Sequence, residues 1–232
     1  YGDGPEGAIV SPSNERELMD VLKLVRERKV SINRELRVSR VAMASIERVD
    51  PASGIAWVGA GVRLADLDRT LADSGLSLGP MSPGAMALDV AEVLEGPRAG
   101  LRCAPGGRLE PMCIALRALM PDGRVYSSLA SPRSAVGPDL DAVFLGACGR
   151  TGLILSAALR TFPAPEIARK VSYRFDDPGP MMRGLRSAIR EGCWVARAKV
   201  ERRSPGFVLE VELAGSASVV ELDLACLEEH AL

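Results

Sequence analysis

Apolar residues in the N-terminal part of the chain change from an extended to a helical spacing. Within residues 7–32 a short apolar run comes first, and Ser13 or Asn14 then provides a helix cap that acidic residues follow. The apolar positions at helical spacing are Leu18, Val21, Leu22 and Val25. This pattern predicts a strand, a helix and a second strand.

Residues 37–79 predict two strands that are joined by a turn and followed by a helix. The turn is the sequence DPASG, in which Pro51 and Gly54 supply the turn chemistry. A helix is expected from about Leu64 to Ala72, and Gly75 is placed to end it. Strands and helices therefore alternate, which predicts a mixed helix and sheet architecture.

The remaining segments continue this alternation. Residues 110–128 predict two strands around the turn PDG, and residues 131–149 predict a loop that leads into a short helix. From about Ile167 the pattern changes to strand, helix, strand, strand, helix, with Gly192 and the sequence SPG as breaks. This order is that of a ferredoxin-like sheet that lacks its last strand.

Composition and charge narrow the classes of partner. The chain has 232 residues and a formal net charge of -1, and its cations are scattered, so nucleic acid is not an expected partner. No apolar run is long enough to cross a bilayer, and the N-terminal residues lack the features of a signal peptide. We therefore expect no transmembrane segment and a cytoplasmic location.

Cysteine and histidine usage argues against several kinds of site. The five cysteines are odd in number and lie far apart, without the spacing of a zinc site, so we expect reduced thiols and no metal. His230 is the only histidine and is expected to be a solvated surface residue. Any chemistry must therefore use groups other than imidazole.

Three glycines with a spacing of three, Gly146, Gly149 and Gly152, lie between an apolar run and a run rich in β-forming residues. Glycine permits close approach of the backbone to a phosphate-bearing ligand, but it equally permits a sharp turn. The spacing alone leaves both interpretations open.

The order of several segments resembles the FAD-binding domain of the vanillyl-alcohol oxidase and p-cresol methylhydroxylase (PCMH-type) flavoprotein family. The similarity runs from about residue 7 to 166 and is carried by the segments SPSNERELMDVLKLVRERKV, ASIERVDPASGIAWVGAGVRLADLDRTLADSGLSL, MPDGRVY and GPDLDAVFLGACGRTGLILSAALRTFPAPE. The segments EGPRAG and SPRSAVGPDL are most similar to the FAD-binding subunit of glycolate oxidase and to FAD-linked 2-hydroxy-acid dehydrogenases.

The resemblance implies an α+β fold, a division of the chain and a cofactor. Residues 1–166 would form a PCMH-type FAD-binding domain of two α+β subdomains, and residues 167–232 a partial ferredoxin-like cap or substrate domain. The implied cofactor is non-covalently bound FAD. The positions carried over as its contacts are Gly84, Ala85, Gly96, Arg98, Gly149, Gly152, Leu153 and Ile154.

This sequence also departs from the family pattern. No glycine occurs between Lys29 and Asp50, where relatives have a glycine-rich phosphate loop, and Asp89 stands where a backbone should approach phosphate. Cys148 replaces the usual acidic residue and is expected to be a small buried hydrophobe rather than a nucleophile. Either a stretch of the full protein between Ile32 and Leu36 is missing here, or the chain is a relative that kept the fold and lost the flavin.

Two functions follow from the resemblance. One is an FAD-linked oxidoreductase, or a subunit of one, that oxidises a small 2-hydroxy acid by hydride transfer to flavin, with partner subunits or a homo-oligomer. The other is a non-catalytic relative that serves as a binding or assembly module. Arg197, Arg202 and Arg203 could hold a substrate carboxylate, although a solvated strand is the commoner role, and no catalytic residue is predicted.

Overall fold

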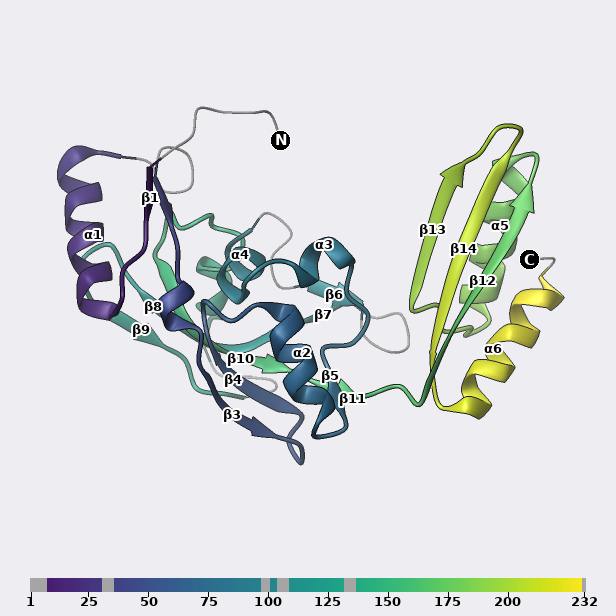
Figure 1. The fold of residues 1–232 in the computed structure, drawn as a ribbon, viewed down its shortest axis with the longest axis horizontal. Coiled ribbons are helices and arrows are strands. Elements are labelled where there is room, and N and C mark those ends of the chain that lie inside the picture. The colour runs from purple at the N-terminus through teal and green to yellow at the C-terminus, as the bar shows by residue number, and fades with distance from the viewer. Residues whose placement is uncertain (1–7, 31–35, 97–100, 104–108, 132–136, 231–232) are drawn as a thin grey trace. The chain divides into compact units, whose positions relative to one another are not determined.

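A computed structural model describes residues 8–30, 36–96, 101–103, 109–131 and 137–230 (Figure 1). The chain divides into two compact units. The first comprises Tyr1–Arg102 and Pro111–Phe162, and the second comprises Cys103–Glu110 and Pro163–Leu232.

The first unit begins with the predicted strand, helix and strand. Strand β1 (Ala8–Val10) pairs in parallel with β2 (Leu36–Val38), and helix α1 (Glu15–Arg28) lies between them in the sequence. Of the two candidate caps, Asn14 is the one used, because its side chain accepts a hydrogen bond from the Glu17 amide at 2.9 Å. The predicted first strand and helix are confirmed, whereas the second strand, which was expected to start before residue 33, begins at Leu36 beyond the undescribed residues 31–35.

A five-stranded antiparallel sheet with the order β3-β4-β10-β8-β9 forms the centre of the first unit. Its strands are β3 (Ile46–Asp50), β4 (Ile55–Gly59), β8 (Cys113–Leu119), β9 (Val125–Ser127) and β10 (Leu153–Arg160). The turns predicted between β3 and β4 and between β8 and β9 are confirmed. Central strand β10 is buried from Leu153 to Leu159, because both faces of the sheet are covered there.

Short elements lie before, between and after these strands in the sequence. They are η1 (Val41–Met43), α2 (Leu64–Ala72), β5 (Leu76–Ser77), α3 (Pro83–Met86), α4 (Val90–Glu95), β6 (Leu101–Cys103), β7 (Leu109–Pro111), η2 (Asp141–Val143) and β11 (Phe162–Pro163). Strands β5 and β11 form one small sheet, and β6 and β7 form another. The predicted helix at Leu64–Ala72 is confirmed, whereas α3 and α4 were not predicted.

Two apolar clusters lie on opposite sides of the sheet. On one side, Leu67 of α2 and Leu94 of α4 belong to the same buried cluster as Ile154 of β10. On the other side, Leu18 of α1 packs in a cluster with Leu153 of β10. Adjacent residues of a strand point to opposite faces, so β10 connects the two layers.

A buried ion pair joins the segment after β2 to the end of α4. Nη2 of Arg40 donates to both carboxylate oxygens of Glu95, at 2.7 and 2.9 Å. The side chains are only 5% and 4% exposed. Oε1 of Glu95 also accepts a hydrogen bond from the Ile154 amide of β10 at 2.7 Å. One carboxylate therefore connects a loop, a helix and the central strand.

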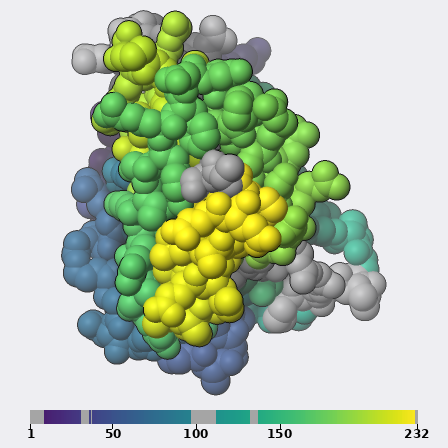
Figure 2. All heavy atoms as spheres, turned by 90° about the vertical axis from the view of Figure 1, so that its right-hand side faces the viewer, coloured from purple at the N-terminus to yellow at the C-terminus, as the bar shows by residue number. Residues whose placement is uncertain are grey.

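The second unit has the predicted order of strand, helix, strand, strand, helix. Its elements are β12 (Ile167–Phe175), α5 (Pro178–Arg190), β13 (Arg197–Arg202), β14 (Phe207–Gly215) and α6 (Ala217–Glu229). The strands form an antiparallel sheet with the order β12-β14-β13, and residues of α5, α6 and β14 share one core. Figure 2 shows α6 on the surface of this unit.

The only histidine of the chain, His230, lies just after helix α6. The expectation that His230 is solvated is wrong, because its side chain is 16% exposed and its Nε2 lies 3.0 Å from a carboxylate oxygen of Glu191. Helix α6 brings the two residues together.

None of the described helices is long and apolar enough to span a membrane.

The buried ion pair generates a prediction about stability. Arg40→Met should destabilise the protein by about 3–5 kcal/mol, because it leaves the Glu95 carboxylate buried without its cation. Adding Glu95→Gln should recover much of this loss, since the amide oxygen can still accept the Ile154 hydrogen bond. Urea unfolding measures the free energies. The control is Arg69→Met, which breaks an exposed pair with Asp66 and should cost less than about 1 kcal/mol.

The packing of Gly152 generates a second prediction. A Cβ at Gly152 would lie 2.6 Å from the Leu119 carbonyl oxygen and 3.0 Å from the Phe144 ring, so Gly152→Ala should cost about 1–3 kcal/mol. Gly84 is the matched control, because a Cβ there meets nothing within 4 Å. Gly84→Ala should leave the urea midpoint unchanged or raise it. Equal losses for both variants would contradict the packing argument.

Candidate functional site

A cavity of about 620 Å³ opens in the first unit, which is within the range of small-molecule sites. Its walls come from β1, the segment after β2, the link between β4 and α2, and the α3–α4 segment. The apolar lining residues are Ile9, Val38, Val41 and Ala87, and the charged ones are Arg40, Arg63, Asp89, Glu92 and Glu95. Ser39, Gly61, Gly96 and Cys148 complete the lining.

Two glycines bring the cavity walls together. A Cβ at Gly61 would lie 1.8 Å from the Arg40 carbonyl oxygen, and a Cβ at Gly59 would lie 2.1 Å from the Met43 carbonyl oxygen. These glycines allow the end of β4 to lie directly against the segment after β2. They therefore position the segment that carries Arg40.

The electrostatics of the cavity floor follow from the Arg40–Glu95 pair. Burial raises the pKa of Glu95, while the charge of Arg40 and the hydrogen bond from Ile154 oppose that rise. Nε of Arg40 is buried and has no hydrogen-bond partner among the described residues. The floor thus has a neutralised ion pair and a buried donor for which the described part of the chain offers no acceptor.

Asp89 is the second fixed carboxylate of the cavity. It is the N-cap of α4, and its Oδ1 accepts a hydrogen bond from the Glu92 amide at 2.7 Å while Glu92 Oε2 accepts one from the Asp89 amide at 3.1 Å. This reciprocal arrangement is a capping box. Burial raises the pKa of Asp89, and the charge of Glu92 adds to the rise, whereas Arg40 opposes it.

The three-glycine segment forms a turn that contacts the C-terminal end of α4. The amide of Gly146 donates a hydrogen bond to the Leu94 carbonyl oxygen at 2.9 Å. The amide of Cys148 donates one to the Glu95 carbonyl oxygen, also at 2.9 Å. Gly146 and Gly149 have φ angles of 73° and 74°, values that favour glycine. The described amides of this turn therefore satisfy helix carbonyls, as a C-terminal cap does.

The structure brings few of the predicted cofactor contacts together. Gly96 lines the cavity, whereas Gly84 and Ala85 belong to α3 and do not. Gly149 and Gly152 lie outside the lining, and Leu153 and Ile154 are fully buried in β10. Arg98 lies outside the described residues. The residues are therefore dispersed over α3, the glycine turn and β10.

Sequence reasoning missed the contribution of Arg40 and Glu95 to this cavity. Nothing local marks them, because they are 55 positions apart and meet only in the folded chain. The Asp89 cap had a readable signal, since an aspartate followed three residues later by Glu92 before apolar positions is a helix start.

The described lining fits one part of FAD and not the other. Val38, Val41 and Ala87 offer apolar walls for a flat ring system. A pyrophosphate instead needs clustered amide donors or cations. The Asp89 carboxylate lines the cavity and accepts the hydrogen bond of the Glu92 amide, which is then not available to a phosphate. A phosphate charge about 4 Å from this carboxylate would be repelled by about 4 kcal/mol at an effective dielectric of about 20. The described residues do not fit the pyrophosphate.

Comparison with known proteins shows what this chain is similar to. A family model described as "FAD binding domain" matches residues 32–128. The D-lactate dehydrogenase of Archaeoglobus fulgidus is 27% identical over 172 residues, which cover 67% of this chain and 38% of that protein. The alkyldihydroxyacetonephosphate synthase of Trypanosoma brucei brucei is 22% identical over 211 residues, which cover 82% of this chain and 34% of that protein. The chain thus spans little more than a third of these relatives.

Solved structures agree in fold. An alkyldihydroxyacetonephosphate synthase structure has a TM-score of 0.77 at 16% identity, covering 96% of this chain and 50% of that chain. The structure of p-cresol methylhydroxylase with bound substrate has a TM-score of 0.72 at 17% identity, covering 96% of this chain and 55% of that chain. The predicted α+β fold and the family resemblance are confirmed. The FAD binding domain match over residues 32–128 and the flavoenzyme neighbours in fold support FAD as the cofactor.

Proposed function

We propose that this chain is the flavin-binding part of an FAD-linked oxidoreductase, similar to a glycolate oxidase subunit, that oxidises a small 2-hydroxy acid. The observation that carries the proposal is the cavity of about 620 Å³, with apolar residues and Gly96 in its lining, in a unit that overlaps the matched FAD-binding domain. The likeness to a D-lactate dehydrogenase supports the substrate class, because lactate is a 2-hydroxy acid.

The proposal assigns different roles to the two parts of the chain. Residues 1–166 would bind the cofactor, and residues 167–232 would be part of a cap over the substrate. The α+β construction of the first unit and the ferredoxin-like order β12-β14-β13 of the second support this division. The chain would act in the cytoplasm, with partner subunits or as a homo-oligomer.

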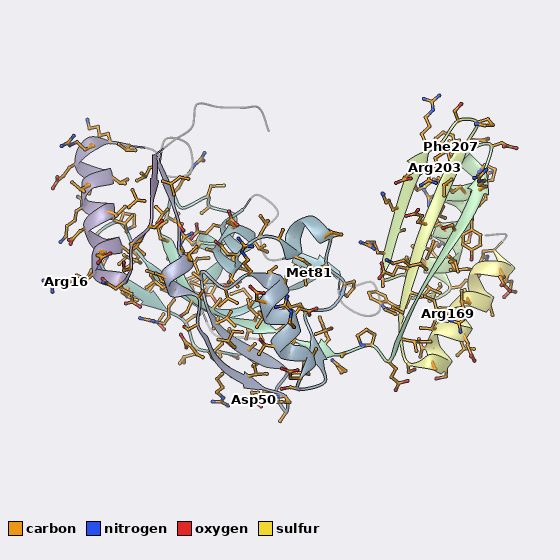
Figure 3. All side chains as sticks on the ribbon, viewed as in Figure 1. Arg16, Asp50, Met81, Arg169, Arg203 and Phe207 are labelled. Atoms are coloured by element: carbon orange, nitrogen blue, oxygen red, sulfur yellow. The ribbon has the colours of Figure 1, made fainter. Side chains whose placement is uncertain are left out.

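Oxidation of a 2-hydroxy acid requires cations for its carboxylate and a base for its hydroxyl proton. Among the candidate cations, Arg197 is paired with Glu212 and Arg203 is paired with Glu201. Figure 3 shows Arg203 and Phe207 near one end of the β13–β14 hairpin. Since both guanidinium groups already have carboxylate partners, a substrate carboxylate would have to compete with Glu201 or Glu212 for them.

A second candidate function is a non-catalytic binding or assembly module with the same fold. The specific observation that favours it is the capping box at Asp89, which occupies helix amides and adds negative charge to the cavity. The use of the Gly146 and Cys148 amides to cap α4 supports it further. In this function the cavity would hold no redox cofactor.

The two functions predict different spectra and different responses to FAD. An oxidoreductase should purify with visible flavin absorbance that denaturation releases, and added FAD should raise Tm, because a ligand that binds the folded state stabilises it. A colourless protein whose Tm does not change with FAD would exclude the enzyme and favour the module. The cavity can be tested with Ala87→Trp, which should abolish the Tm response by filling the space. The control is Ala52→Trp, at an exposed turn residue, which should leave the response intact.

A further inference from the structure

Two cysteines of the second unit meet between helices α5 and α6. The amide of Cys193, just after α5, donates a hydrogen bond to the Ala188 carbonyl oxygen at 3.0 Å, and Sγ of Cys226 on α6 donates to that same oxygen at 3.9 Å. Sγ of Cys193 in turn donates to the Asp223 carbonyl oxygen of α6 at 3.6 Å. Each sulfur therefore contacts the segment that carries the other.

The two cysteine side chains also lie against each other. Both belong to the core of this unit, and both are free thiols. Burial raises the pKa of Cys193 to about 12, and the charges of Asp223 and Cys226, with a hydrogen bond between the two thiols, add to the rise. A hydrogen bond between thiols places the two sulfur atoms in direct contact. Such contact is what a disulfide requires, because its two Cβ atoms lie only about 3.8 Å apart.

The two thiols differ in their access to solvent. Cys193 is 6% exposed, and its raised pKa keeps it protonated at neutral pH. Cys226 is only partly buried. Because the exposed thiolate is the form that attacks an oxidant, Cys226 is the sulfur that a small oxidant meets first. Cys193 then needs no encounter in solution, since the fold already holds it beside Cys226.

We infer that Cys193 and Cys226 are a thiol pair that a small disulfide in solution oxidises to an intramolecular disulfide, which ties α6 to the residues after α5. In the first step the Cys226 sulfur loses its proton to water and attacks the small disulfide, forming a mixed disulfide with one half and releasing the other half as a thiolate. In the second step the Cys193 sulfur loses its proton and attacks the Cys226 sulfur, which releases the second half. Two protein thiols are thereby oxidised, and one small disulfide is reduced to two thiols that take up the two protons.

The test is incubation of the folded whole chain at neutral pH with bis(hydroxyethyl) disulfide, followed by blocking of the remaining thiols, proteolysis and mass spectrometry. We expect the peptides that carry Cys193 and Cys226 to be recovered joined to each other, whereas a reduced sample should give them separately with both thiols blocked. A folded chain in which both thiols stay free, or in which the reaction stops at a mixed disulfide, would overturn the inference. Joining that occurs only in the urea-unfolded chain would overturn it as well.

Single variants separate the roles of the two thiols. Cys193→Ser should stop at the mixed disulfide on Cys226, whereas Cys226→Ser should leave Cys193 unmodified, because Cys193 is buried. The control is Cys113→Ser, at a buried cysteine of the first unit, which should leave the joined peptides intact. Modification of Cys193 in Cys226→Ser as fast as in the unmodified chain would overturn the order of the two steps. Neither thiol lines the cavity of the first unit, so a negative result leaves the proposed function standing.

Discussion

The buried contact between Arg40 and Glu95 is the interaction on which the first unit depends. Two charges with side chains 5% and 4% exposed are tolerated only because each finds the other and the carboxylate also accepts the Ile154 amide. That arrangement fixes the end of α4 against β10 and holds the segment after β2 beside both. The cavity exists at this junction, so its shape and its charge come from the same contact.

Helix α4 illustrates how one short helix can alter a binding site. Its N-terminus is closed by the capping box of Asp89, and its C-terminal carbonyls accept amides from the glycine turn. At a ligand site, the amides at a helix N-terminus can bind a phosphate. Here Asp89 and the glycine turn satisfy the two ends of α4 instead.

The second unit is organised by simpler rules. Odd-numbered residues of β14, such as Leu209 and Val211, pack in one core with α5 and α6. On β13 and β14, Arg197 and Lys199 pair with glutamates instead. Successive side chains of a strand point to opposite faces of the sheet, so one face is apolar and packs in the core while the other carries the ion pairs. The sequence therefore predicts the order of elements here, because each is long and regular.

The sequence by itself determined most elements, including α1 with Asn14 as one of two candidate caps, the β3–β4 turn, and α2 from Leu64 to Ala72. These depend on local spacing, capping and turn residues. Only the tertiary structure decided that Gly146 and Cys148 cap α4, that Gly152 packs against Leu119, and that Arg40 meets Glu95. Such contacts join residues far apart in the chain. The sequence also cannot distinguish a glycine that is needed for packing from one that is needed for close approach to a ligand.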